Sequence, residues 1–280
     1  LGDVYKRQVY NQADIQSRLK TKWVAHPLQF FDSIDSTNIR AKLEAEQGAK
    51  SGLLVVSDMQ SAGRGRRGRS WESPAGTNIY YTLMLKPDFS SDCAPMLTLV
   101  MALAVAKGIR QTLRRDSEEA AAKVGIKWPN DIVVDGKKVC GILTEMSMEQ
   151  GYIQHIVIGV GINVRKQEFP EEIRDRAAAI DEQCGFRISR SQLIADIMEA
   201  FEEDYEIFLR THDLKGLRAS YAELLVNQDR EVCVLDPKGE YRGIARGIND
   251  QGELLVERQD GTVEEVYAGE VSVRGIYGYV

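Results

Sequence analysis

Runs of hydrophobic and polar positions predict three strands and a helix in the first part of the chain. Residues 30–49 (FFDSIDSTNIRAKLEAEQGA) predict a strand followed by a helix that begins near Ser36 or Thr37, because hydroxyl side chains are favoured helix N-caps. Residues 52–60 (GLLVVSDMQ) contain a continuous apolar run that is typical of a buried strand. The alternating run at 78–85 (NIYYTLML) is rich in residues that favour strands and predicts another.

The middle of the chain predicts a long helix and then a group of adjacent strands. The apolar segment at 95–115 ends in a basic turn, which suits the negative end of a helix dipole. An Asp-Gly pair at 135–136 lies between β-rich runs at 124–134 and 137–148, and this is a strong hairpin signal. A further strand pattern covers 152–164 (YIQHIVIGVGINV). Neighbouring strands with short turns predict an antiparallel meander.

Helical patterns dominate the next region, at 171–183, 190–210 and 213–225, and a short one lies at 9–25. Strands and helices therefore do not alternate strictly along the chain. This order predicts the α+β class, with a mixed or antiparallel sheet and helices, rather than a doubly wound parallel sheet.

The pattern changes after Asn227. Five short β-rich runs follow, separated by the turn sequences PKGE, NDQG and QDG. Short strands with frequent turns predict a small barrel of about fifty residues. We therefore divide the chain into an N-terminal remnant or linker at 1–27, a main domain at 28–227 and a small β domain at 228–280.

Composition narrows the classes of partner. Of the 280 residues, 43% are hydrophobic and 28% are charged, and the formal net charge is −6. An acidic chain argues against broad nucleic-acid binding through overall charge, although a local basic patch is compatible with it. We find no signal peptide and no apolar run of membrane-spanning length, so we expect no membrane association. Residues 1–8, which begin with Leu and not Met, have no periodicity and are left out of the fold prediction.

Cysteine and histidine usage argues against a structural zinc site and against a disulfide framework. Cys93, Cys140, Cys184 and Cys233 lie far apart, no CxxC pair exists, and the chain has only three histidines. This usage is typical of a protein from the reducing cytoplasm.

An arginine-rich loop follows the strand at 52–60. The sequence GRGRRGRSW at 63–71 places four arginines and three glycines within nine residues. Arginine presents a planar set of donors that suits phosphate and carboxylate, and glycine allows close approach of the backbone to a ligand. The loop therefore predicts an anion site, with a solvated basic loop or an Arg-Gly RNA-binding segment as alternatives. Walker A, G-x-S-x-G and HExxH motifs are absent from the sequence.

Three further segments combine polar groups with turns. DSTN at 35–38 places two hydroxyls and an amide at a predicted helix start, where free N–H groups can also bind polar ligands; simple capping is the alternative, and the favoured one for Ser36 alone. KWPND at 127–131 serves a ligand site or an ordinary turn with a surface lysine equally well. In GKKVCGIL, either Lys137 or Lys138 must face inward if the strand alternates, and a buried lysine needs an anionic partner; two solvated lysines are the alternative.

Taken in order, these segments resemble the motifs of one enzyme family. DSTN, Q-x-x-GRGRRGR-x-W, KWPND, KKVCGIL and IGVGINV occur here as they do in biotin protein ligases of the bacterial BirA type, over about residues 28–227. Lipoate ligases share the catalytic fold but lack this arginine loop. The resemblance implies a class II synthetase-like catalytic domain, followed by an SH3-like C-terminal domain. It also implies that biotin and ATP form biotinyl-5′-AMP and pyrophosphate, and that biotin then passes to a lysine of a biotin carboxyl carrier protein.

The resemblance also assigns roles to individual positions. The implied catalytic residues are Arg64, Arg66 and Lys138. The implied biotin contacts are Ser36, Thr37, Asn38, Gln60, Arg64, Gly65, Arg66 and Lys138. The implied ATP contacts are Arg67, Arg69, Trp71, Lys127, Asn130, Asp131 and Asn163. Trp71 is expected to pack over the closed loop or the nucleotide, with a plain core tryptophan as the alternative. Asp131 is the candidate for an indirect contact to Mg²⁺. Cys140 is expected to be a packing residue.

Many bacterial relatives also carry an N-terminal DNA-binding module. About 27 residues precede the predicted catalytic domain, which is too few for a winged helix-turn-helix. We therefore expect either a monofunctional ligase or a truncated bifunctional ligase and repressor, and no DNA binding by residues 1–280. A non-catalytic regulator that senses biotinyl-AMP is a further alternative. A homodimer is compatible with the resemblance, and the sequence does not set the oligomeric state.

Overall fold

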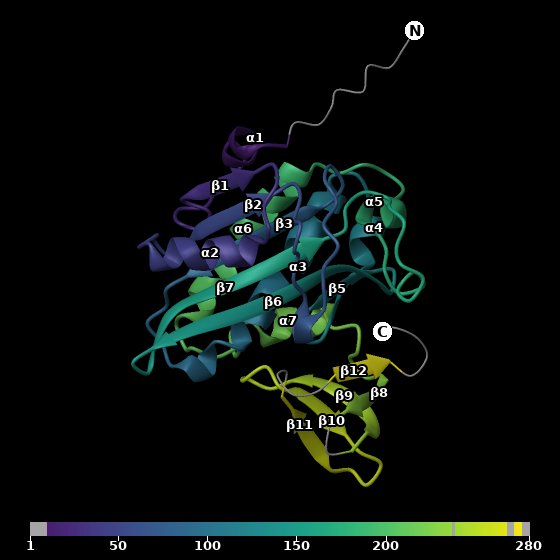
Figure 1. The fold of residues 1–280 in the computed structure, drawn as a ribbon. Coiled ribbons are helices and arrows are strands. Elements are labelled where there is room, and N and C mark those ends of the chain that lie inside the picture. The colour runs from purple at the N-terminus through teal and green to yellow at the C-terminus, as the bar shows by residue number, and fades with distance from the viewer. Residues whose placement is uncertain (1–9, 237–238, 268–271, 276–280) are drawn as a thin grey trace.

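The computed structural model describes residues 10–236, 239–267 and 272–275 (Figure 1). The expectation for residues 1–8 lies outside this part. A seven-stranded mixed sheet forms the centre of the main body, and only its first pair of strands is parallel. In spatial order the strands are β1 (Leu28–Phe31), β2 (Leu53–Ser57), β3 (Ile79–Leu85), β7 (Tyr152–Ile162), β6 (Lys137–Glu149), β5 (Asp131–Val134) and β4 (Val124–Lys127).

Helices cover both faces of this sheet. The long helices α3 (Met96–Arg114) and α6 (Arg190–Phe208) pack together on one face and bury most of the apolar core with it. Helix α2 (Thr37–Glu46) packs on β2, β3 and β7, above a smaller apolar cluster that includes Ala41, Val55 and Val157. The short helices are α1 (Gln12–Gln16), α4 (Glu118–Ala122), α5 (Ile180–Cys184) and α7 (Arg218–Leu224). The observed architecture is a mixed sheet with helices on its faces, in agreement with the mixed or antiparallel sheet that the sequence pattern predicts.

The hairpin predicted at the Asp-Gly pair joins β5 to β6. Asp135 and Gly136 both have positive φ, at 51° and 74°, which is the backbone of a two-residue hairpin turn. Strands β6 and β7 then pair over almost their whole length, so the meander is confirmed.

Three of the predicted helical segments are shorter in the structure. Within 171–183 only α5 is helical, because the preceding segment pairs with the sheet: the Lys138 amide donates to the Arg176 carbonyl, and the Ala178 amide donates to the Lys138 carbonyl. Within 213–225 the helix begins only at Arg218, and the amide of Leu214 donates instead to the Asp250 carbonyl of the C-terminal region. The pattern at 9–25 reduces to α1.

The expectation that no apolar run reaches membrane-spanning length is wrong for the segment that contains helix α3. The segment Ser91–Arg114 is long and apolar enough to cross a membrane by length and composition alone. In the fold, however, 72% of its most apolar window is buried against the sheet and α6. Its hydropathy is that of a core helix.

The C-terminal region forms a second, five-stranded antiparallel sheet. In spatial order its strands are β11 (Val263–Val266), β10 (Leu254–Glu257), β9 (Tyr241–Ile248), β8 (Glu231–Leu235) and β12 (Ser272–Gly275). Figure 1 shows this sheet below the main body, near α7. The Trp128 indole N–H donates to the Gly252 carbonyl at 2.9 Å, which joins the two parts. The domain boundary near Asn227 stays a prediction.

Candidate functional site

A pocket of about 360 Å³ opens beside the N-terminus of α2, between the arginine loop and the β4–β5 turn. Every site residue that the sequence analysis named lines it. These residues are Ser36, Thr37, Asn38, Gln60, Arg64, Gly65, Arg66, Arg67, Arg69, Trp71, Lys127, Asn130, Asp131, Lys138 and Asn163. Segments separated by more than a hundred residues in the sequence therefore meet at one cavity.

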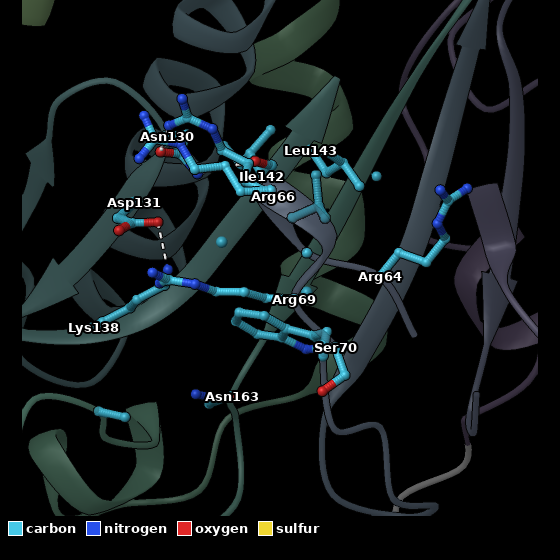
Figure 2. Close-up of a pocket in the computed structure, with 18 of the residues that line it drawn as sticks. Arg64, Arg66, Arg69, Ser70, Asn130, Asp131, Lys138, Ile142, Leu143 and Asn163 are labelled. Atoms are coloured by element: carbon cyan, nitrogen blue, oxygen red, sulfur yellow. Dashed lines mark hydrogen bonds and ion pairs between the residues drawn. The ribbon is translucent and has the colours of Figure 1, made fainter. Parts of the chain in front are cut away.

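The arginine loop is closed on itself by backbone hydrogen bonds. The Gly65 amide donates to the Arg69 carbonyl at 2.7 Å, and the Trp71 amide donates to the Gly63 carbonyl at 2.9 Å. At Gly63 a Cβ atom would overlap the Trp71 carbonyl, so the base of the loop requires glycine. This frame presents the arginines to the pocket (Figure 2).

Arg66 crosses the pocket and contacts the KWPND turn. Its Nη1 donates to Oδ1 of Asn130 at 2.6 Å, while the Asn130 amide nitrogen donates to the Ile142 carbonyl at 3.0 Å. Burial lowers the pKa of Arg66, the nearby Asp131 opposes this shift, and Arg67 adds to it. Asn130 thus links the arginine loop to strand β6.

Lys138 is the inward-facing lysine of the hairpin. Its Nζ lies 2.6 Å from Oδ1 of Asp131 (Figure 2). The same Nζ lies 5.6 Å from the centroid of the Trp71 ring, whereas Lys137 is exposed. Lys138 is half-buried, and Asp131 is the anionic partner that an inward-facing lysine needs. Trp71 is partly exposed and packs on the glycine backbone of β6 and β7 at Gly141 and Gly161, so it is not a plain core residue.

Uncharged polar groups gather at the other end of the pocket. The backbone amide and the hydroxyl of Thr37 donate to Oε1 of Gln60, at 2.9 and 3.0 Å. Ser36 occupies the N-cap position of α2 as predicted, but its hydroxyl makes no capping hydrogen bond and the residue is buried. Simple capping, the favoured alternative for Ser36, is therefore wrong for its side chain.

Two other predicted residues are more buried than a surface role would allow. Lys127 is 6% exposed, so the alternative of a surface lysine on a turn is wrong. Asn163 is also 6% exposed, and its side-chain oxygen accepts from Gln167 at 3.3 Å. Cys140 is fully buried, and burial raises the pKa of its thiol, as suits a packing residue.

Several residues around the pocket are not predicted from the sequence. Gly141 and Gly161 leave room for Trp71, and Arg176 lines the pocket from the segment that pairs with β6. Glu145, on β6, accepts from both Asn38 and Lys42. The motif IGVGINV contained a signal for Gly161, whereas neither Arg176 nor Glu145 lies in a motif.

The pocket offers little to a tightly held metal ion. In the described part of the chain, no cluster of three or more His, Cys, Asp or Glu side chains could hold a metal. The carboxylate that lines the pocket is that of Asp131, which already pairs with Lys138. Electrostatically the site is a cationic cavity with polar groups at one end.

Comparisons with known proteins agree with this geometry. Residues 30–163 match the Biotin/lipoate A/B protein ligase family, and residues 229–274 match the Biotin protein ligase C terminal domain. The chain is 36% identical over 267 residues to the bifunctional ligase/repressor BirA of Bacillus spizizenii. The aligned region covers 94% of this chain and 79% of that protein. It is 30% identical over 242 residues to a biotin–[acetyl-CoA-carboxylase] ligase of Paracoccus denitrificans, which covers 84% of this chain and 98% of that one.

Solved structures show the same fold. The biotin protein ligase of Aquifex aeolicus in complex with biotin and ATP superposes with a TM-score of 0.74 at 29% identity, over 89% of this chain and 98% of that one. The biotin protein ligase of Leishmania major in complex with biotinyl-5-AMP superposes with a TM-score of 0.56 at 26% identity, over 86% of this chain and 98% of that one. By sequence and by fold, the chain belongs to the biotin protein ligase family.

Proposed function

We propose that this chain is an ATP-dependent biotin protein ligase. It activates biotin to biotinyl-5′-AMP with release of pyrophosphate, and then transfers biotin to a lysine of a biotin carboxyl carrier protein. The observation that carries the proposal is the meeting of a polar end and a cationic end in one pocket. The ureido ring of biotin has two N–H donors and one carbonyl acceptor, which suits hydroxyl and amide partners, while its carboxylate suits cations.

In the first step an oxygen of the biotin carboxylate attacks the α-phosphorus of ATP. The new P–O bond forms as the bond to pyrophosphate breaks, and both reacting groups are anions. Lys138, Arg64 and Arg66 are the residues we assign to this step, because their positive charges reduce the repulsion and stabilise the leaving pyrophosphate. Asp131 holds Lys138 ready in the pocket through the 2.6 Å ion pair.

The second step breaks the mixed anhydride. A lysine amine of the carrier protein attacks the biotinyl carbonyl carbon, an amide bond forms, and AMP leaves. Closure of the arginine loop would shield the anhydride from water between the two steps. The backbone hydrogen bonds within the loop support this role, because they hold the arginines together as a unit.

We assign the remaining contacts as the family resemblance implies, and all of these residues line the pocket. Biotin lies at the α2 end, with Ser36, Thr37, Asn38, Gln60, Gly65 and the catalytic cations as its partners. ATP lies at the other end, with Arg67, Arg69, Trp71, Lys127, Asn130, Asp131 and Asn163. Mg²⁺ is usually bound through one or two carboxylates together with substrate phosphates and water. Asp131, which pairs with Lys138, would contact indirectly, through water, a Mg²⁺ ion that arrives with ATP, and the ion's charge would offset that of the phosphates.

Release of pyrophosphate from ATP on addition of biotin is the test of the first step. Biotin-dependent release identifies the ligase, whereas tight binding of biotinyl-AMP without release would identify the non-catalytic sensor instead. Transfer is then checked by mass spectrometry of a biotin carboxyl carrier domain, which should gain one biotin on lysine. A cytoplasmic location, an SH3-like form of the C-terminal sheet, a homodimer, the absence of DNA binding and the absence of membrane association remain predictions.

A further inference from the structure

Glu145 lies beside the pocket but has no part in the mechanism given above. It stands on β6 opposite Val157 of β7, two residues beyond the pocket-lining Leu143. Residues two apart on a strand point to the same face, so Glu145 faces α2 and the pocket. Its side chain is 22% exposed. A carboxylate in this place requires compensation by neighbouring donors.

Three neighbours supply that compensation, from two different parts of the fold. Nδ2 of Asn38 donates to Oε2 of Glu145 at 2.8 Å, and Nζ of Lys42 donates to Oε1 at 2.8 Å. Nη1 of Arg64 lies 3.5 Å from the same Oε1. Burial acts to raise the pKa of Glu145, but the hydrogen bonds and charges of these neighbours outweigh it, so the pKa lies below its ordinary value. Glu145 is thus anionic at neutral pH.

The carboxylate fixes the orientation of the Asn38 amide. An ionised carboxylate only accepts hydrogen bonds, so the amide nitrogen must face Glu145. The amide oxygen then faces Thr82, whose hydroxyl lies 2.6 Å away. Gly159 leaves room for this amide, since a Cβ atom there would overlap Asn38. Glu145 and Thr82 together thus fix which way the amide of this pocket-lining residue points.

Glu145 also contacts the arginine loop. The Arg64 side chain is 49% exposed and lies apart from Arg66 and Arg69, on the side of Leu143 (Figure 2). The contact therefore ties the first arginine of the loop to strand β6, near the helix that carries Asn38. Lys42 and Arg64 carry two positive charges against the single negative charge of Glu145. The net positive charge of these three residues suits the approach of an anionic ligand.

We propose that Glu145, with Lys42 as its counter-ion, is a positioning residue that orients Asn38 and holds Arg64 at the biotin end of the pocket. This inference rests on the proposed function, since it takes Asn38 and Arg64 as biotin contacts. A Glu145→Gln change keeps the shape but removes the charge. The new side chain can present either a donor or an acceptor, so the Asn38 amide is no longer fixed.

Steady-state release of pyrophosphate separates this role from a structural one. Glu145→Gln should raise the KM for biotin about tenfold, the effect of weakening a hydrogen bond to a charged group. The KM for ATP should stay within about twofold of the unchanged protein. The kcat should fall by a smaller factor than the biotin KM rises, because Arg64 keeps its own charge. Glu149→Gln is the matched control, because Glu149 is an exposed glutamate on the same strand and lies outside the pocket. Equal biotin KM values for the two variants would overturn the proposal, and so would a parallel rise in both KM values.

Calorimetric titration with biotin alone keeps the inference distinct from the proposed function. If the unchanged protein binds biotin but releases no pyrophosphate, the function fails, and the loss of biotin affinity in Glu145→Gln still tests the positioning role. If it binds no biotin, both fail. Where Glu145→Gln unfolds, Lys42→Met replaces it, since Lys42 is 31% exposed. Lys42→Met should weaken biotin binding in the same direction, and unchanged binding would count against the proposal.

Discussion

Adjacent residues on one strand of this protein have opposite environments. Lys137 is exposed to solvent, whereas Lys138 lines the pocket and pairs with Asp131. The difference follows from the hairpin turn at Asp135 and Gly136, which sets the phase of β6. Two lysines of identical chemistry are therefore expected to contribute very differently to the reaction.

Alanine substitution of each lysine measures that difference. Lys138→Ala should cost on the order of 2–4 kcal/mol of transition-state stabilisation, because a preorganised cation is lost from the reacting anions. Lys137→Ala should stay within about 0.5 kcal/mol, as for other exposed positions. The rate of biotin-dependent pyrophosphate release is the measurement. Equal losses in the two variants, or a larger loss in Lys137→Ala, would show that the assignment of this role to Lys138 is wrong.

Many residues that line the pocket could be named from the sequence, because they lie in motifs that resemble those of biotin protein ligases. Glu145 could not, since a glutamate within a polar strand end is indistinguishable from a solvated one until Asn38 and Lys42 are placed beside it. The burial of Lys127 could not be predicted from the sequence either, because KWPND is also compatible with a turn at the surface. Tertiary contacts determine the environment of such residues, and the local sequence pattern does not predict these contacts.

At the scale of elements, strands and long helices follow local pattern closely, whereas short segments follow their neighbours. The residues before α5 carry a helical pattern, yet Arg176 and Ala178 pair with Lys138 at the sheet instead. Backbone groups that find partners on a strand gain nothing from a marginal helix of their own. The sequence therefore predicts β6 and α3 well, and the connection after β7 poorly.

The packing of α2 on β7 leaves a histidine under the helix. His155 is 1% exposed, and within the described residues neither of its ring nitrogens has a hydrogen-bond partner. Burial lowers its pKa from the ordinary 6.5, Glu46 opposes the shift, and Lys42 and Lys86 add to it. The folded state therefore favours the neutral ring, whereas the unfolded chain binds a proton more readily.

This difference predicts a loss of stability in mild acid. Below about pH 6.5 the unfolded state takes up a proton that the folded state still resists, so the free energy of unfolding falls until the lower folded-state pKa is passed. In His155→Gln this loss should shrink, whereas His212→Gln, at an exposed position, should keep it. Urea denaturation between pH 7.5 and 5.5 measures this loss. An unchanged pH dependence in His155→Gln would show that His155 is not its source.

At the scale of the whole molecule, the second sheet is joined to the turn that forms one wall of the pocket. Trp128 lies between Lys127 and Asn130 in the KWPND turn, is 2% exposed, and donates its indole N–H to the Gly252 carbonyl. Arg218 and Asp250 form an ion pair of 2.9 Å at the same junction. The sequence predicts both parts and their order, but no pattern within either part identifies the other as its partner.

Replacing Trp128 by Phe tests whether this junction supports the pocket. The change keeps an aromatic ring but removes the buried donor, so the Gly252 carbonyl loses its partner and the free energy of unfolding should fall by about 1–3 kcal/mol. Because Lys127 and Asn130 flank the tryptophan, the KM for ATP should rise more than the KM for biotin. Trp23→Phe is the matched control, since Trp23 packs on Tyr205 outside the pocket. Urea denaturation and pyrophosphate-release kinetics on both variants give the answer. If Trp128→Phe is destabilised but its two KM values change in parallel, the C-terminal sheet stabilises the protein without shaping the ATP end of the site.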